Sequence, residues 1–180
     1  MKQIVFLGIK HSGKTTQGKL LAAALGVPFA DSDELLVHRY RELYGGERSA
    51  REIMTVHGAE FFRRLEAEAV RKLCPGEARV LALGGGVPVN PFLAADRLKG
   101  LGFLIWLDVD AETAFARILA GGIPPFLAGD DPHEKFMKQY RERAVRYAAV
   151  ADLRLSVASG AAPEEVHRQI VRELKELGMI

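Results

Sequence analysis

The segment 8–15, which reads GIKHSGKT, constrains the fold more than any other feature of the sequence. It directly follows the short apolar run 4–7 and leads into a stretch of helical periodicity over 14–25. Its glycines allow the backbone to curl so that N–H groups converge, and the start of the following helix favours an anion. The spacing matches a Walker A phosphate-binding loop, in which Lys14 meets the β- and γ-phosphates of a nucleotide and Thr15 can bind Mg²⁺.

Short apolar runs alternate with longer stretches of helical period along the rest of the chain, which is typical of βαβ units and a parallel sheet. The spacing of Ser49 and Glu52 predicts a capping box, and Pro163 suits a first helical turn. The predicted strands are 4–7, 27–30, 80–83, 103–106 and 153–156. The predicted helices are 14–25, 34–43, 59–72, 91–98, 111–119 and 163–177.

We therefore expect an α/β fold with a five-stranded parallel sheet covered by helices on both faces, in the manner of P-loop kinases. Residues 1–180 are long enough for a single domain, and an apolar content of 48% is sufficient for its core. Glycines, prolines and paired aspartates interrupt the pattern over 120–132, so this segment is either a lid or a long loop.

Charge and cysteine content exclude several classes of protein. Lysine and arginine total 25 against 23 acidic residues, which does not favour nucleic acid or a membrane as the main partner. Cys74 is the only cysteine, so neither an internal disulfide nor a structural zinc site is expected. No targeting or membrane-spanning pattern is present, and we expect a cytoplasmic protein that is a monomer by default.

Acidic residues follow the second predicted strand, at the edge of the sheet where open α/β folds bind ligands. Asp31, Ser32 and Asp33 stand immediately before a predicted helix. One carboxylate could organise Mg²⁺ while another accepts the proton of an attacking hydroxyl. On this segment alone, capping of the helix by one of these side chains is the more common explanation.

Three further features have an ordinary structural explanation as well as a functional one. Arg63 and Glu66 are neighbours on one helix face and could form a surface pair. The glycines at 84–86 either make a tight turn or let a ligand approach backbone N–H groups. Within the phosphate loop, Lys10 can contact a phosphate or be solvated, and His11 can contribute its backbone N–H.

Taken together, the Walker A loop, the segment 31–33, Phe62-Arg63 with Glu66, and the glycines 84–86 resemble the shikimate kinase family in order and spacing. Near the C-terminus, Arg143 and Tyr147 followed by Ala151-Asp152 resemble the segment of that family in which an arginine completes the substrate pocket. The resemblance extends over nearly the whole chain and implies the nucleoside monophosphate kinase-like architecture, with ATP and Mg²⁺ as cofactors.

The resemblance also implies roles for particular residues. Asp33 would contact the substrate hydroxyls and act with Lys14 in catalysis, and Asp31 would support Mg²⁺ together with Thr15. Arg63 and Arg143 would clamp the shikimate carboxylate, with Glu66 holding Arg63 in position. The substrate-binding residues implied are Asp33, Arg63, Gly84, Gly85, Gly86 and Arg143. The nucleotide-binding residues implied are Gly8, Lys10, His11, Ser12, Gly13, Lys14, Thr15, Thr16 and Arg117, the last against the adenine or else solvated.

The sequence departs from the family pattern at its lid. Pro124 stands where the family has an arginine that closes over the phosphates, and such an arginine can contribute a factor of ~10³ to 10⁵ in rate. Lys10 could supply part of this missing charge. Ala59 and Val145 also replace a glutamate and a proline of the family pattern.

The leading functional hypothesis is therefore ATP-dependent phosphorylation of the 3-hydroxyl of shikimate, a small-molecule substrate. One alternative is a kinase for another carboxylated polyol such as gluconate, which could use the same arginine clamp. The other is a regulatory module that binds a nucleotide without catalysis, as the missing lid arginine would suggest.

Overall fold

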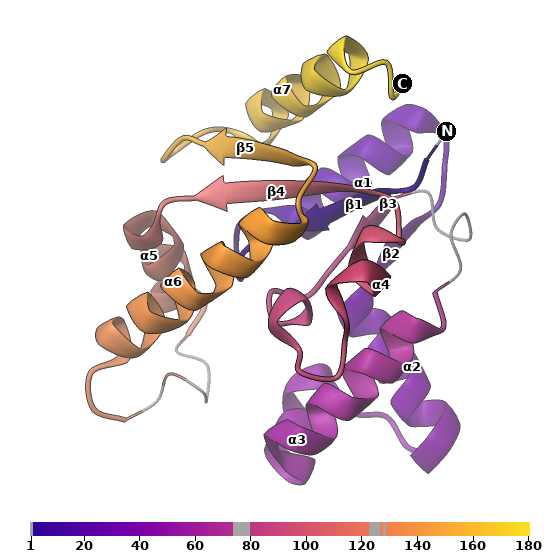
Figure 1. The fold of residues 1–180 in the computed structure, drawn as a ribbon. Helices are drawn as coiled ribbons and strands as arrows, with labels where there is room; N and C mark the ends of the chain where they lie inside the picture. The colour runs from indigo at the N-terminus through magenta and orange to yellow at the C-terminus, as the bar shows by residue number, and fades with distance from the viewer. Residues whose placement is uncertain (1, 74–79, 123–126, 128) are drawn as a thin grey trace.

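A parallel sheet with strand order β2-β3-β1-β4-β5 organises the structure, a computed structural model that describes residues 2–73, 80–122, 127 and 129–180 (Figure 1). All adjacent strands pair in parallel. This confirms the predicted five-stranded sheet. The strands are β1 (Ile4–Leu7), β2 (Phe29–Asp31), β3 (Val80–Ala82), β4 (Phe103–Val109) and β5 (Leu153–Val157).

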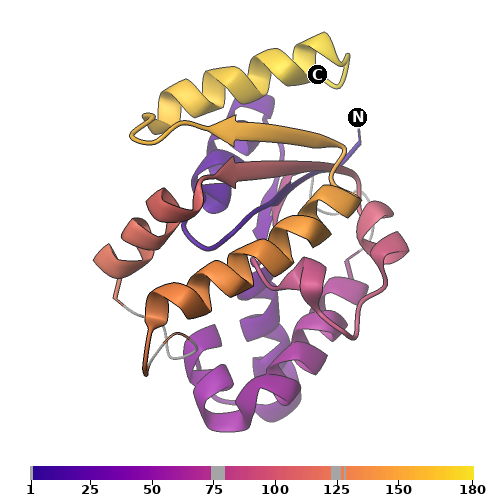
Figure 2. The same cartoon turned by 60° about the vertical axis from the view of Figure 1, so that its left-hand side comes forward.

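Helices cover both faces of this sheet (Figures 1 and 2). Successive residues of β1 belong to different cores: Phe6 packs on the side of α1 and α7, and Val5 on the side of α4 and α6. Because side chains alternate along a strand, apolar residues at every position require cover on both faces. The helices are α1 (Lys14–Leu25), α2 (Ser32–Tyr44), α3 (Ala50–Arg71), α4 (Ala95–Lys99), α5 (Ala111–Ala120), α6 (Pro132–Val150) and α7 (Pro163–Glu176), with a short 3-10 helix η1 (Val87–Val89).

The prediction of helices was incomplete in three places. The helix predicted over 59–72 begins earlier, since α3 covers Ala50–Arg71 and is only interrupted at Gly58. Helix α6 was not predicted, because its buried positions are few and include the charged Arg143, so its apolar period is weak. The helix predicted over 91–98 is confirmed only in its second half, since α4 begins at Ala95 and the 3-10 helix η1 precedes it. The predicted capping box is confirmed: Ser49 Oγ accepts from the Glu52 N–H, and Glu52 accepts from the Ser49 N–H.

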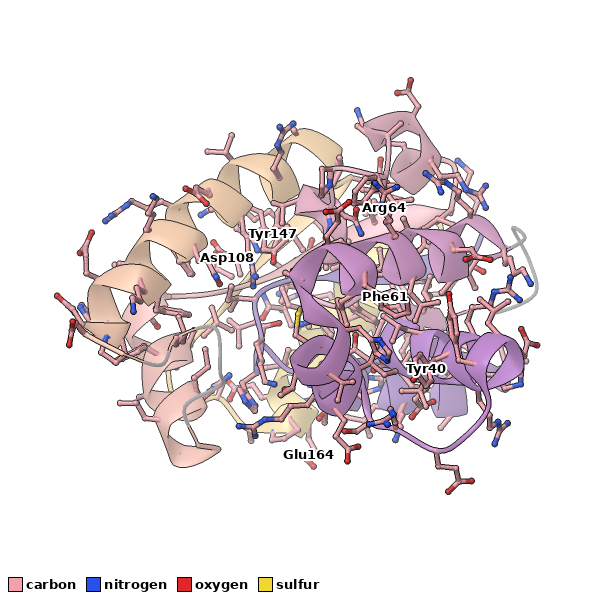
Figure 3. All side chains as sticks on the ribbon, turned by 90° about the horizontal axis from the view of Figure 1, so that it is seen from below. Tyr40, Phe61, Arg64, Asp108, Tyr147 and Glu164 are labelled. Carbon is pink, nitrogen blue, oxygen red and sulfur yellow. The ribbon has the colours of Figure 1, made fainter. Side chains whose placement is uncertain are left out.

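Helices α2 and α3 pack against each other and project beyond the sheet, as Figure 2 shows at the foot of the molecule. Gly58, with φ of 82° and ψ of 172°, breaks α3 into two helical parts. The Tyr40 hydroxyl lies 2.9 Å from His57 Nε2, and Tyr40 and Phe61 make an edge contact in this layer (Figure 3). The second part of α3, after Gly58, is therefore held by α2 and carries Arg63 towards the sheet.

None of the helices within the described ranges is both long enough and apolar enough to cross a membrane.

Candidate active site

The phosphate loop connects the end of β1 to the start of α1. Gly13, at the N-cap of α1, has φ of 94° and open space around the position of a Cβ, so glycine is needed here for backbone conformation. Helix α1 begins without a side-chain cap and without an acidic residue in its first turn, whereas Asp31 caps α2. The N-terminus of α1 therefore has the features of an anion site.

Lys14 is 9% exposed, and its Nζ donates to the Ile9 carbonyl oxygen at 2.8 Å. Burial lowers the pKa of Lys14 to about 8, with the charges of Asp33 and Asp31 acting in the opposite direction. A phosphate in this loop would offer the ammonium group a stronger partner than the carbonyl.

The other residues that we expect to bind the nucleotide lie in the phosphate loop, at the start of α1 and on α5. His11 has φ of 62°, and its ring faces Gly121 at the end of α5. Arg117 Nη1 donates to the His11 carbonyl oxygen at 3.2 Å, so this arginine is tied to the phosphate loop. Lys10 and Thr16 are exposed, whereas Ser12, within the phosphate loop, is buried.

Asp31 both caps a helix and contacts the phosphate loop, so the two explanations of this residue are compatible. Its Oδ1 accepts from the Asp33 N–H at 3.0 Å, and its Oδ2 accepts from Thr15 Oγ1 at 2.8 Å. Hydroxyl and carboxylate oxygens of this kind suit Mg²⁺, which is usually held by one or two carboxylates together with substrate phosphates and water. No group of three or more His, Cys, Asp or Glu side chains that could hold a metal occurs in the described part of the chain, so phosphate and water would have to complete the shell.

Asp33, in the first turn of α2, lies between the phosphate loop and α3, the helix that carries Arg63. Restricted hydration raises the pKa of Asp33 above its usual value, and the charges of Asp31 and Glu66 act in the same direction. The charges of Lys14 and Lys10 oppose this shift. The side chain is still exposed on its open side, where a ligand can reach it.

The glycines 84–86 follow β3, and close neighbours distinguish them more than backbone conformation does, because none of them has a positive φ. A Cβ on Gly84 would lie 2.7 Å from Asp33 Oδ1, and one on Gly85 would lie 3.1 Å from the Gly8 carbonyl oxygen. On Gly86 it would overlap the Arg63 guanidinium. The three glycines therefore let the acidic segment, the phosphate loop and Arg63 come together.

Arg63 and Arg143 meet in this site from different helices. Arg63 Nη1 donates to Glu66 Oε2 at 2.7 Å; Glu66 is 3% exposed and Arg63 is half-buried, so this is not the surface pair that its spacing allowed. Burial lowers the pKa of Arg143, which is 9% exposed, and the charge of Arg63 acts in the same direction. Two cations that act on each other in a partly desolvated site favour binding of an anion.

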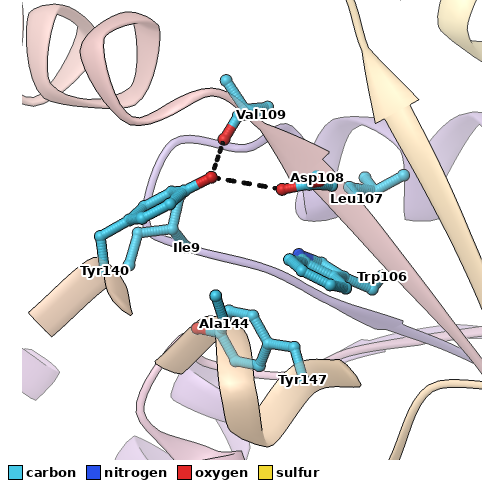
Figure 4. Close-up of a pocket in the computed structure, with 8 residues that line it drawn as sticks. All are labelled: Ile9, Trp106, Leu107, Asp108, Val109, Tyr140, Ala144 and Tyr147. Atoms are coloured by element: carbon cyan, nitrogen blue, oxygen red, sulfur yellow. Dashed lines mark hydrogen bonds between the residues drawn. The ribbon is translucent and has the colours of Figure 1, made fainter. Parts of the chain in front are cut away.

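Tyr147, one helical turn after Arg143 on α6, connects this helix to the glycine loop. Its hydroxyl donates to the Gly85 carbonyl oxygen at 2.6 Å, and its ring contacts Trp106 of β4 edge to face (Figure 4). Burial raises the pKa of Tyr147, which keeps the hydroxyl protonated as a donor. Arg143 is thereby fixed relative to β3 and β4.

The same helix is anchored to the sheet at a second point, which no sequence motif indicates. The Tyr140 hydroxyl donates to the Val109 carbonyl oxygen at 2.9 Å and lies 3.3 Å from Asp108 Oδ1 (Figure 4). Arg154 of β5 donates from Nε to Asp108 Oδ2 at 2.8 Å. No sequence motif connects these residues, because only the order of the strands in the sheet brings them together.

This site combines a phosphate loop, a carboxylate beside it and a pair of arginines opposite. Such a combination defines the protein class as P-loop kinases that act on a small anionic alcohol. The family model for shikimate kinase matches residues 10–175. The chain is 36% identical over 177 residues to a shikimate kinase of Symbiobacterium thermophilum, with 97% of each chain covered. It is 36% identical over 172 residues to one of Caldanaerobacter subterraneus, covering 96% of this chain and 95% of the relative. The chain belongs to the shikimate kinase family.

Solved structures agree with this assignment. Shikimate kinase from Aquifex aeolicus superposes with a TM-score of 0.71 at 27% identity, with 98% of each chain covered. Shikimate kinase from Acinetobacter baumannii, solved in complex with shikimate, superposes with a TM-score of 0.84 at 24% identity and covers 100% of this chain and 96% of its own. The predicted P-loop kinase fold is confirmed.

The buried position of Lys14 makes nucleotide binding dependent on pH. A bound triphosphate stabilises the charged lysine and raises its pKa above the value of about 8 in the free protein. Complex formation should therefore take up protons, about half a proton per ATP near pH 8, and affinity should fall as the pH rises further. Calorimetry in buffers of different ionisation enthalpy measures this uptake.

A Lys14→Met variant serves as the control, since its weak binding should show no such uptake above pH 7.5. Equal proton uptake in wild type and variant would contradict the assignment of this titration to Lys14.

Proposed function

We propose that this protein transfers the γ-phosphoryl group of ATP to the 3-hydroxyl of shikimate. The position of Asp33 supports this function most strongly. Its carboxylate lies against Gly84, within electrostatic range of Lys14 on one side and of Glu66, the partner of Arg63, on the other. An alcohol bound there would face the end of a nucleotide in the phosphate loop.

Arg63 and Arg143 supply the recognition of the carboxylate in this proposal. A guanidinium group offers paired donors that match the two oxygens of a carboxylate. Arg63 uses Nη1 for Glu66, which leaves its other N–H groups for a ligand. A substrate carboxylate between these arginines would also offset their mutual repulsion, which contributes to the lowered pKa of Arg143.

The chemical step follows from these positions. The substrate oxygen forms a bond to the γ-phosphorus, the bond from that phosphorus to the β–γ bridging oxygen breaks, and ADP leaves. Asp33 orients the hydroxyl and accepts its proton as the new bond forms. Lys14 stabilises negative charge on the β- and γ-phosphate oxygens.

Thr15 and Asp31 are the residues that would hold Mg²⁺ beside these phosphates, with Asp31 acting through water. Bound Mg²⁺ neutralises charge on the β- and γ-phosphate oxygens. The two side chains already lie together in the protein, because Thr15 Oγ1 donates a hydrogen bond to Asp31 Oδ2.

Other expectations stay predictions. These are a single kinase domain over 1–180, a monomer in the cytoplasm, the nucleotide contacts of Thr16, and an adenine contact from Arg117, whose present bond is to the phosphate loop. The lid predicted at 120–132 also stays a prediction, and Pro124 lies outside the described residues.

Production of ADP from ATP and Mg²⁺, with and without shikimate, tests the proposed function. Wild-type protein should show turnover that depends on shikimate, and Asp33→Asn should lower kcat by about 10² to 10⁴, the usual contribution of a general base. The variant should still bind ADP as the wild type does, because its phosphate loop is unchanged.

Absence of shikimate-dependent turnover in a wild-type protein that binds ADP would contradict the proposal. Turnover with gluconate would then indicate another carboxylated alcohol, and no turnover with either would favour a nucleotide-binding regulatory module.

Lys10 replaces part of the charge of the lid arginine in this account. No other described residue forms a hydrogen bond or ion pair with its side chain, and its charge acts on Lys14 and Asp33. Lys10→Ala should lower kcat by about 10²-fold, as loss of one transition-state donor does. Lys2→Ala, at the opposite end of β1, is the matched control and should leave kcat unchanged. An unchanged kcat in Lys10→Ala would exclude this role.

The glycine loop allows two neighbouring substitutions with different expected effects. Gly86→Ala places a methyl group against the Arg63 guanidinium and should mainly raise the KM for shikimate, by about 10-fold, through displaced donors. Gly84→Ala places it against Asp33 Oδ1 and should mainly lower kcat. Steady-state kinetics separate the two. Identical changes of KM and kcat in both variants would argue against separate roles for Arg63 and Asp33.

A further inference from the structure

Asn90 lies at the end of η1 and is 3% exposed. Its Nδ2 donates at 2.8 Å both to the Arg63 carbonyl oxygen and to Glu66 Oε2, and its Oδ1 accepts from the Phe92 N–H at 2.9 Å. Both ends of this buried amide are therefore satisfied. Two of its three bonds lead to the residue pair assigned to the substrate carboxylate.

We propose that Asn90 is a positioning residue that sets the orientation of the Arg63 guanidinium through Glu66. This inference rests on the proposed function and adds to it a residue that makes no contact with substrate itself. Asn90 determines how well Arg63 can bind a carboxylate.

The geometry at Glu66 explains how this works. Glu66 Oε2 accepts from Arg63 Nη1 at 2.7 Å and from Asn90 Nδ2 at 2.8 Å, so two donors fix the same oxygen. A carboxylate held by a single mobile guanidinium could rotate with it. The amide of Asn90, locked by Phe92 and by the backbone of α3, prevents this rotation.

The short helix η1 reaches Arg63 at both ends. Gly86, at its start, lies directly against the guanidinium, and Asn90, at its end, holds the Arg63 carbonyl oxygen and Glu66. The guanidinium is therefore confined between the backbone of Gly86 and a fixed carboxylate. The N–H groups of Arg63 that are not bonded to Glu66 keep a fixed direction only while both Gly86 and the Glu66 carboxylate hold the guanidinium.

A purely structural amide would stabilise the fold without any link to substrate binding. The buried amide of Gln3 is an example: it is 4% exposed and donates from Nε2 to the Leu101 carbonyl oxygen at 2.9 Å, just before β1 at the edge of the sheet opposite the site. Gln3→Ala is therefore a matched control that removes a buried amide remote from Arg63.

A double-mutant cycle separates the two roles. In wild-type background, Asn90→Ala should lower kcat/KM for shikimate by roughly 10- to 100-fold through a raised KM, with the KM for ATP unchanged. In an Arg63→Met background, the same substitution should cause less than about a 3-fold further loss, because residues that act through one another are not additive. Gln3→Ala should have the same small effect in both backgrounds.

An equal loss from Asn90→Ala in both backgrounds, or a loss that matches Gln3→Ala, would overturn the assignment. Asn90→Asp provides a second variant if the alanine protein does not fold, since it retains the shape and the acceptor for Phe92 but replaces the donor to Glu66. The same non-additivity with Arg63→Met is expected for it, and additivity would overturn the assignment. A wild-type protein that neither binds nor phosphorylates shikimate would overturn the proposed function together with this assignment, whereas additivity in an active wild type overturns only the assignment.

Discussion

The parallel pairing of β3 with both β1 and β2 is the constraint on which the rest of the site depends. Each of these strands ends in a different functional segment: the phosphate loop after β1, Asp31 to Asp33 at the end of β2, and the glycines 84–86 after β3. Since parallel strands end at the same edge of a sheet, residues far apart in sequence meet without any long loop. The glycine loop stands between the other two, and lack of side chains there allows both to approach it.

Partial desolvation of charged groups is the second constraint, and it acts on both signs. Lys14 and Arg143 have lowered pKa values and Asp33 has a raised one, with desolvation as the first cause in each case. Such groups are costly unless a ligand compensates for their lost hydration. A nucleotide at one end and a substrate carboxylate at the other would supply that compensation, while Asp33 is left between them to accept a proton. The desolvated charges that are costly in the free protein therefore favour the complex with both nucleotide and substrate.

Sequence patterns predicted much of this architecture, because local signals agreed with the global fold. The strand before GIKHSGKT and the capping box at Ser49 are examples in which spacing alone implied the observed structure. Helix α6 was missed since its inward face includes Arg143, a charged residue where the periodicity of a helix leads one to expect an apolar one.

Residues that lack a local signal required the three-dimensional structure. The glycines 84–86 were compatible with a tight turn until the positions of Asp33, Gly8 and Arg63 explained each of them. Asn90 and Tyr140 carry no motif, and the contacts of Asn90 with Arg63 and Glu66 and of Tyr140 with Asp108 join residues more than twenty positions apart, so no pattern along the chain connects them. Contacts of this kind follow from strand order and helix packing and are invisible to periodicity.

The central claim is that one ligand spans from Arg63 and Arg143 to Asp33, with its alcohol facing the phosphate loop. A crystal structure of the protein with Mg²⁺, ADP and shikimate tests this directly. The account predicts the shikimate carboxylate within hydrogen-bond distance of both guanidinium groups and a ring hydroxyl within hydrogen-bond distance of an Asp33 carboxylate oxygen. Shikimate bound with its carboxylate away from both arginines, or with no hydroxyl near Asp33, would contradict it.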